Sequence, residues 1–115
     1  MNFKHIYKII DADDWQKVKE SGTYSGSSKD TQDGFIHFSG EEQVKGTLEK
    51  HYSKQKNLVL LKVETLKLDH LIWEQASDGN KFPHLYSPLD LSNGVDEFEI
   101  TLSDDSTHKL PDNFN

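Results

Sequence analysis

Two short segments of the chain combine a histidine with a hydroxyl residue in an apolar setting. His37 precedes Ser39 by two positions in the run GFIHFS, and His84 precedes Tyr86 by two positions in the run FPHLY. Because alternate side chains of an extended strand share a face, each pair would present two polar groups side by side. A core does not need such polarity, so we expect the two segments to line one cleft.

The residues that alternate with these polar groups support the same interpretation. Ile36 and Phe38 would point away from His37 and into the core. The alternative for His37 and His84 is a partly buried imidazole that is hydrogen-bonded to backbone or to a carboxylate, and both interpretations remain open. The other four histidines are predicted to lie on the surface: His5, His51, His70 and His108.

Nucleophilic hydrolysis is a chemistry that His37, Ser39 and the upstream Asp33 superficially suggest, because a serine nucleophile needs a base and the base needs an orienting carboxylate. The context argues against it. The Gly-x-Ser-x-Gly turn of serine hydrolases is missing, and Ser39 with Glu42 matches a helix capping box. Ser39 is therefore predicted to end a strand and begin a helix.

A metal site built from the two histidine segments with Asp33 or Glu74 is a second alternative, but no local His spacing favours it, and we predict no metal. Glu74 follows Trp73 on a short predicted strand. It is either a paired edge carboxylate or a catalytic or ribose-binding acid. Tyr7 and Tyr86 are either core aromatics with a hydrogen-bonded hydroxyl or ligand contacts.

Composition narrows the range of partners. The 115 residues carry a net charge of −7, with thirteen lysines and no arginine, which opposes nucleic acid and anionic membrane surfaces as partners. The absence of cysteine removes disulfides and cysteine-based metal sites. No apolar stretch has the length of a signal peptide core or a membrane span, so we expect a soluble cytoplasmic protein.

The elements that must position these residues follow from periodicity and turn signals. The mixture of helices and irregularly spaced strands indicates one α+β domain over residues 1–103, followed by a polar, frayed tail over residues 104–115. The strands are expected at 3–10, 35–38, 57–64, 72–75 and 95–102, the two main helices at 11–22 and 39–52, and a long loop at 23–33. The strand at 57–64 is expected to be central, and the loop is long enough to have a function.

The order of these motifs resembles a known bacterial family, domain of unknown function 952. The resemblance covers about residues 3–102. It rests on Ile6-Tyr7-Lys8-Ile9 before the Trp15 helix, Gly22-Thr23-Tyr24, Asp33 to Ser39 with Gln43, Leu58 to Leu61, Trp73-Glu74, and Phe82 to Leu89. Family members of known shape resemble the ADP-ribosyltransferase fold, in which small mixed or antiparallel sheets enclose a central cleft that holds NAD.

The resemblance implies roles for the candidate residues. Tyr7 and Lys8 would occupy the first-strand position that grips the dinucleotide, where many members carry histidine, and Tyr7 would stack on nicotinamide. His37 and Ser39 would shape the nicotinamide pocket. The remaining three would face the cleft, with Glu74 standing in for the glutamate that steadies the ribose cation: Glu74, His84 and Tyr86.

Two functions follow as hypotheses. The first is an enzyme-like cleft for NAD or another nucleotide-like small molecule, with Glu74 and His37 as catalytic residues and Tyr7, Lys8, Ser39, His84 and Tyr86 as ligand contacts. An anionic cofactor would require local compensation of the negative charge, expected from Lys8 and Lys81. The second is a non-catalytic binding or regulatory module for a small metabolite or a peptide.

Overall fold

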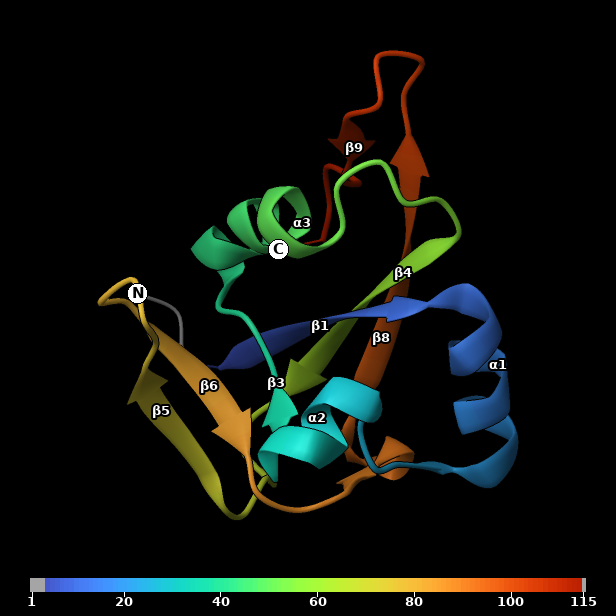
Figure 1. The fold of residues 1–115 in the computed structure, drawn as a ribbon. Helices are drawn as coiled ribbons and strands as arrows, with labels where there is room; N and C mark the ends of the chain where they lie inside the picture. Colours follow the sequence, from blue (N-terminus) through green and yellow to red (C-terminus); the bar gives the residue numbers. More distant parts are fainter. Residues whose placement is uncertain (1–3, 115) are drawn as a thin grey trace.

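A four-stranded antiparallel sheet forms the centre of the computed structural model, which describes residues 4–114. The strands lie in the order β1 (His5–Asp11), β4 (Leu58–Glu64), β8 (Val95–Leu102) and β9 (His108–Lys109). Figure 1 shows β1, β4 and β8 crossing the middle of the molecule. The apolar run of β4 is paired on both edges, by β1 and by β8, which confirms the expected central strand.

Two smaller antiparallel sheets complete the strand arrangement. The three-stranded sheet has the order β3 (Ile36–His37), β6 (Lys81–Leu85) and β5 (Leu71–Gln75). The two-stranded sheet pairs β2 (Thr23–Tyr24) with β7 (Leu89–Asp90). Antiparallel sheets with few helices confirm the predicted α+β class.

Three α-helices surround the sheets: α1 (Ala12–Ser21), α2 (Ser28–Asp33) and α3 (Val44–His51). Two short 3-10 helices, η1 (Glu41–Gln43) and η2 (Leu91–Asn93), precede α3 and β8. In Figure 1, α3 lies on one side of β1, α2 lies on the other, and α1 flanks the opposite end of the sheet. Among residues 4–114, no helix has the length and apolar character needed to cross a membrane.

The helix α1 has the boundaries that its sequence predicts. The side chain of Asp11 accepts hydrogen bonds from the backbone amides of Asp13 and Asp14, and Gly22 ends the helix with a φ of 80°. A left-handed conformation of this kind suits glycine because it has no Cβ. Trp15 is the buried side chain of α1 and packs into the core.

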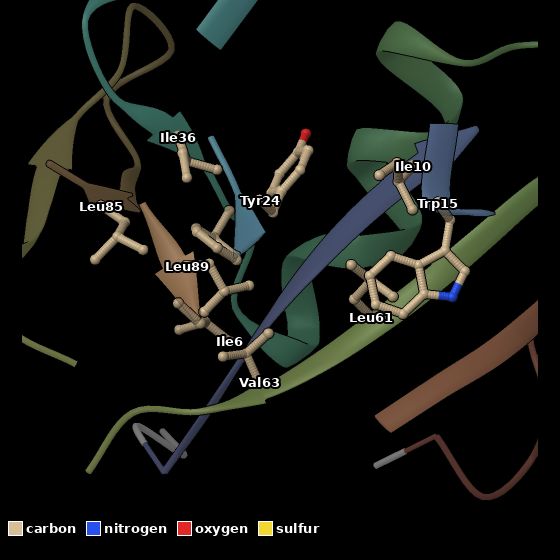
Figure 2. Close-up of a cluster of buried hydrophobic side chains, with 10 residues drawn as sticks. Ile6, Ile10, Trp15, Tyr24, Ile36, Leu61, Val63, Leu85 and Leu89 are labelled. Atoms are coloured by element: carbon tan, nitrogen blue, oxygen red, sulfur yellow. The ribbon is translucent and has the colours of Figure 1, made fainter. Parts of the chain in front are cut away.

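Apolar side chains gather on both faces of the central sheet. On one face, residues of β1 and β4 pack with Trp15 and with side chains from the smaller sheets (Figure 2). On the other face, Val44 and Leu48 of α3 pack against Leu58 and Leu60. Lys8 of β1 is buried beside these apolar side chains, and a buried charged residue requires a partner.

A single bridge connects the central sheet to the three-stranded sheet. Tyr7 and Ser39 exchange two backbone hydrogen bonds, with N···O distances of 2.8 and 2.7 Å. Ser39 lies just beyond β3, so the bridge holds His37 beside the β1 strand that carries Lys8. The junction between the two sheets is thus the place where the candidate residues collect.

The segment 23–33 is not the loop that its composition predicted. It contains β2 and α2, and α2 begins at a capping box formed by Ser27 and Asp30 and ends at Gly34. Helical periodicity was missing because α2 is polar on all sides, and its buried residue is the acid Asp30. The sequence shows the capping residues Ser27 and Gly34. The contact that stabilises Asp30 is with Lys8 of β1, and it forms only in the folded chain.

Two further expectations require correction. Ser39 does not form the predicted capping box: the N-cap is Gly40, whose amide donates to Gln43 Oε1, and Ser39 Oγ pairs with Thr47 Oγ1 at 2.8 Å. The C-terminal segment is also ordered. Its strand β9 pairs with β8, and Leu110 and Phe114 pack against the α3 face of the core. The scattered apolar residues of this polar segment find partners only in the folded chain.

Candidate functional site

The two histidine segments meet, as the sequence predicted. Strands β3 and β6 pair so that His37 lies opposite His84, with the ring centroids 5.5 Å apart. Ile36 and Phe38 point into the core as expected, each with 3% exposure. Phe35 packs against both imidazoles, with ring centroids 4.6 Å from His37 and 4.1 Å from His84.

A cavity of about 840 Å³ lies beside these rings, between α2, α3 and the hairpin of β5 and β6. Its volume is within the range of small-molecule binding sites. The candidate residues that line it are Tyr7, Lys8, His37, Ser39 and His84. Glu74 and Tyr86 lie outside the lining, so the structure brings five of the seven candidates to one cavity.

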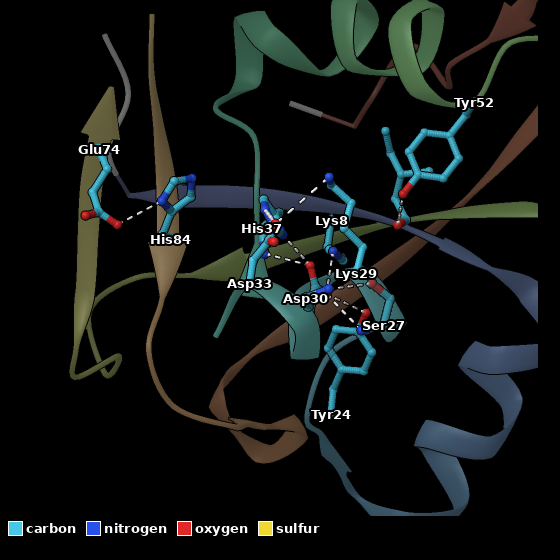
Figure 3. A network of polar contacts seen from close by, with 11 residues as sticks. Lys8, Tyr24, Ser27, Lys29, Asp30, Asp33, His37, Tyr52, Glu74 and His84 are labelled. Carbon is cyan, nitrogen blue, oxygen red and sulfur yellow. Dashed lines mark hydrogen bonds and ion pairs between the residues drawn. The ribbon is translucent and has the colours of Figure 1, made fainter. Parts of the chain in front are cut away.

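Glu74 lies behind His84 as seen from the cavity. Its Oε1 atom contacts His84 Nδ1 at 2.9 Å (Figure 3). The same atom accepts a hydrogen bond from the Tyr86 hydroxyl. These hydrogen bonds, from Tyr86 first and His84 second, lower the pKa of Glu74. An ionised carboxylate at Nδ1 places the imidazole proton on that nitrogen, which leaves Nε2 as the acceptor.

His37 is held differently, because a carboxylate contacts each of its ring nitrogens. Nδ1 lies 2.5 Å from Asp30 Oδ1, and Nε2 lies 3.0 Å from Asp33 Oδ2. Both contacts are hydrogen bonds only when both nitrogens carry protons, so this geometry suits a charged imidazolium. Such a ring has no lone pair for proton abstraction, and its contribution to a site would be positive charge and donor positioning.

Asp30 is the buried centre of this network. With 2% exposure, it accepts hydrogen bonds from Lys8 Nζ at 2.9 Å, from the Ser27 amide at 2.9 Å and from the His37 amide at 3.1 Å. Burial alone would raise the pKa of Asp30, but the hydrogen bond from His37 and the charge of Lys8 hold it well below its usual range. Sequence reasoning missed this residue, although an acid three positions after Ser27 is a capping signal.

Tyr7 does not fit the nicotinamide-stacking role that the family resemblance implied. The Tyr7 ring is 1% exposed and packs edge-on against Phe114 with a centroid distance of 5.6 Å, which leaves no open face for stacking on nicotinamide. Burial, together with Glu41, raises the pKa of Tyr7 to about 12. The Lys8 ammonium is paired with Asp30 at the floor of the cavity.

Of the two compensating lysines that the sequence suggested, Lys8 lines the cavity and Lys81 does not. The Lys81 carbonyl accepts a hydrogen bond from Gln43 Nε2 at 2.7 Å. Lys29 of α2 and Lys50 of α3 line the cavity together with Lys8. Only the folded chain, in which α2 and α3 both line one cavity, reveals this arrangement. No cluster of three or more potential metal ligands occurs within residues 4–114.

The fold and the cavity define a small α+β protein with a candidate ligand site at the junction of two antiparallel sheets. The chain belongs to the family described as protein of unknown function (DUF952), whose model matches residues 9–96. This match covers both histidine segments and Glu74. No curated protein matches the chain.

Solved structures of one bacterial protein share this architecture. The crystal structure of protein CC0527 from Caulobacter crescentus is 42% identical, with a TM-score of 0.85 over 91% of this chain and 93% of that chain. A double mutant of CC0527 is 40% identical with the same TM-score and coverage. The solution NMR structure of CC0527 is 42% identical, with a TM-score of 0.81 over 91% of each chain.

Proposed function

We propose that the cavity binds a small nucleotide-like molecule and that His84 acts on it as a general base. The observation that carries this proposal is the pair formed by Glu74 Oε1 and His84 Nδ1, at 2.9 Å, with His84 lining the cavity. A carboxylate that holds the proton on one imidazole nitrogen leaves the other free to accept one, which is the relation of base and orienting acid in hydrolytic triads.

The nucleophile in this proposal is a water molecule or a hydroxyl of the ligand. His84 Nε2 would take its proton while the new bond forms at the electrophilic carbon. His37 would contribute hydrogen-bond donors or positive charge on the same side of the cavity, because a carboxylate contacts each of its ring nitrogens. Glu74 is a positioning residue in this scheme, since it acts through His84.

NAD is the cofactor that the ADP-ribosyltransferase resemblance suggests, and an ADP-ribosylation-like fold is part of this proposal. In that reaction the bond between ribose C1′ and the nicotinamide nitrogen breaks, and its electron pair leaves with nicotinamide. A water molecule or an acceptor hydroxyl, deprotonated by His84, forms the new bond to C1′. The size of the cavity and the two imidazoles at its edge support this choice.

A non-catalytic binding module is the second candidate. It is favoured by the position of Glu74, whose side chain is 39% exposed and lies outside the cavity lining. A carboxylate in this place orients His84 without touching a ligand. The cavity could then hold a small metabolite by contacts alone, with His84 serving as a hydrogen-bond acceptor.

Thermal unfolding and product analysis separate the two candidates. The protein is incubated with NAD, ADP-ribose, AMP or nicotinamide, the melting temperature is recorded, and released nicotinamide is measured by chromatography. Stabilisation by NAD or ADP-ribose with nicotinamide release supports the enzyme. Stabilisation without release supports the module. Absence of stabilisation by every compound, at concentrations up to the millimolar range, contradicts both.

Variants test whether His84 is the general base. In His84→Gln, turnover should fall at least about 100-fold, the usual minimum for loss of a general base. Glu74→Gln should lower turnover less, because the glutamine Oε1 atom can still accept a hydrogen bond from His84 Nδ1–H. The matched controls are His108→Gln on β9 and Glu49→Gln on α3, both outside the cavity. Equal turnover in His84→Gln and His108→Gln would exclude His84 as the base.

A further inference from the structure

Lys8 presents unused hydrogen-bond donors at the floor of the cavity. Its side chain is 7% exposed, and the ammonium contacts Asp30 Oδ2 at 2.9 Å. An ammonium group has three N–H donors. Within residues 4–114, Asp30 is the only hydrogen-bond acceptor of the Lys8 ammonium. The Tyr24 ring lies 6.0 Å from Nζ on one side. The remaining donors of a buried cation that lines a cavity are available to an anionic group inside it.

Two further lysines approach the same space from opposite walls. Lys29 projects from α2 and Lys50 from α3, and both line the cavity. Figure 3 draws Lys29 together with Lys8 and Asp30 in one polar network. Lys29 has one weak partner, Asp33 at 3.9 Å, and Lys50 has no ion pair in the described part of the chain. Their ammonium groups can therefore turn towards a ligand at small cost.

Two of the four acids in the lining are already paired with cations. Asp30 is engaged by Lys8 and His37, and Asp33 is engaged by His37 and Lys29. The other two acids of the lining are Glu42, on η1, and Asp78, in the turn between β5 and β6. The charge of Lys50 contributes to lowering the pKa of Asp78, although the two side chains form no ion pair. Lys29 and Lys50 therefore have no strong ion-pair partner in the described part of the chain, although the lining as a whole holds four acids beside three lysines.

The behaviour of His51 agrees with this charge distribution. Burial lowers the pKa of His51, and the charges of Lys50, Lys29 and His37 lower it further. Charged side chains from α2, α3 and β3 therefore all lower the pKa of one imidazole that lines the cavity. A neutral His51 can still donate one hydrogen bond to an anion.

The wall formed by α3 is open where a ligand would approach. Gly46 lines the cavity, and a Cβ at this position would meet no atom within 4 Å. Glycine in the middle of a helix lowers helix stability by about 1 kcal/mol relative to alanine, and nothing in the surrounding packing requires it. Its absent side chain extends the space between Lys50 and the cavity floor.

We propose that the gap between α2 and α3 is a phosphate subsite, in which Lys8, Lys29 and Lys50 hold a phosphate or pyrophosphate group of the ligand. The proposal rests on the proposed function of the cavity and defines its ligand as a phosphorylated small molecule. The phosphate lies at the α2 and α3 end, so the part of the ligand that reacts is directed towards His84. A phosphate group satisfies three separate cations better than a single carboxylate because it offers more acceptor oxygens.

Titration of the full chain with sodium pyrophosphate tests this subsite. Backbone amide shifts are followed by ¹H–¹⁵N NMR at constant ionic strength, with sodium chloride as the reference salt. We expect saturable shifts at residues 8–9, 29–30 and 46–51. Lys50→Gln should weaken binding about threefold, and Lys29→Gln with Lys50→Gln about tenfold, as expected for partly exposed charges. Lys45→Gln is the matched control, since Lys45 lies on α3 outside the cavity lining.

The outcomes distinguish this subsite from the function proposed above. Pyrophosphate binding that depends on Lys50 and persists in His84→Gln supports the subsite even where no turnover is found. Shifts that do not saturate, or that are equal in Lys45→Gln and Lys50→Gln, overturn it. If NAD or adenosine shifts the cavity residues while pyrophosphate does not, the subsite is wrong and ligand binding by the cavity stands.

Discussion

Asp30 of α2 joins β1 and β3 through one buried carboxylate that contacts the side chains of Lys8 and His37. It receives the Lys8 ammonium, the His37 imidazole and two backbone amides. A carboxylate with 2% exposure can remain ionised only with such compensation. The same contacts fix the orientation of His37, so the stability of the site and its geometry depend on one residue.

Replacement of Asp30 by asparagine should therefore destabilise the fold strongly. Lys8 would stay buried without its counter-charge, and the expected loss is about 3 kcal/mol in the free energy of unfolding. Asp33→Asn is the matched control, because the Asp33 side chain is 37% exposed and its loss should cost less than about 1 kcal/mol. Urea denaturation monitored by tryptophan fluorescence measures both values. Equal losses in the two variants would contradict a central role for Asp30.

The low pKa of Asp30 also predicts a pH dependence of stability. Burial would raise this pKa, but His37 and Lys8 lower it below its value in the unfolded chain, which is about 3.9. The unfolded state then binds more protons below about pH 4, so the stabilisation is present above that pH and is lost as the pH falls. Urea midpoints between about pH 5 and pH 2 should decline more steeply for the wild type than for Asp30→Asn. Parallel declines would show that Asp30 is not responsible.

At the scale of elements, the sheet junction and the helix α3 determine the shape of the cavity. The backbone bridge between Tyr7 and Ser39 sets the distance between β1 and β3. Across the opening, α3 presents Gly46 and Thr47 to the cavity. The Thr47 hydroxyl is held by Ser39 Oγ and by the Gln43 carbonyl, at 2.8 and 3.1 Å. The wall is thus fixed in place except at Gly46, where no side chain projects.

Substitution of this glycine should stabilise the protein. Gly46→Ala adds a methyl group in open space and raises helix propensity, so the free energy of unfolding should increase by about 0.5–1 kcal/mol. Gly22→Ala is the opposite control, since Gly22 has a φ of 80° and its replacement should cost roughly 1 kcal/mol. Thermal denaturation of the two variants gives the comparison. A destabilised Gly46→Ala would mean that the space beside α3 is occupied.

At the scale of the whole molecule, the C-terminal segment closes one side of the core. Strand β9 extends the central sheet, and Phe114 packs against Tyr7 over a separation of more than one hundred residues. Leu110 contacts the same side of the core as α3. The residues after β8 therefore belong to the packing that supports β1, the strand that carries Lys8.

Removal of the Phe114 ring should accordingly weaken the fold. Phe114→Ala loses a half-buried aromatic contact, with an expected cost of about 1–2 kcal/mol in the free energy of unfolding. Leu66→Ala is the matched apolar control, because Leu66 is 92% exposed and its removal should change stability by less than about 0.5 kcal/mol. Chemical denaturation compares the two. An unchanged stability in Phe114→Ala would show that the segment does not support β1.

The sequence by itself determined the elements whose stability is local. The Asp11 cap and the Gly22 end of α1, the apolar run of β4, and the inward direction of Ile36 and Phe38 all follow from short-range periodicity and backbone preference. The pairing of His37 with His84 was also anticipated, since polar residues in apolar strands need a shared surface.

Only the tertiary structure decided which charges meet and which side chains remain accessible. Asp30 is an unremarkable polar residue in the sequence, yet it becomes the buried partner of Lys8. Tyr7 was expected to contact a ligand, but its ring packs against Phe114, and Lys29 and Lys50 come to one cavity only in the folded chain. Coulombic and packing contacts depend on distance in space, and no local pattern encodes distances between segments that lie so far apart along the chain.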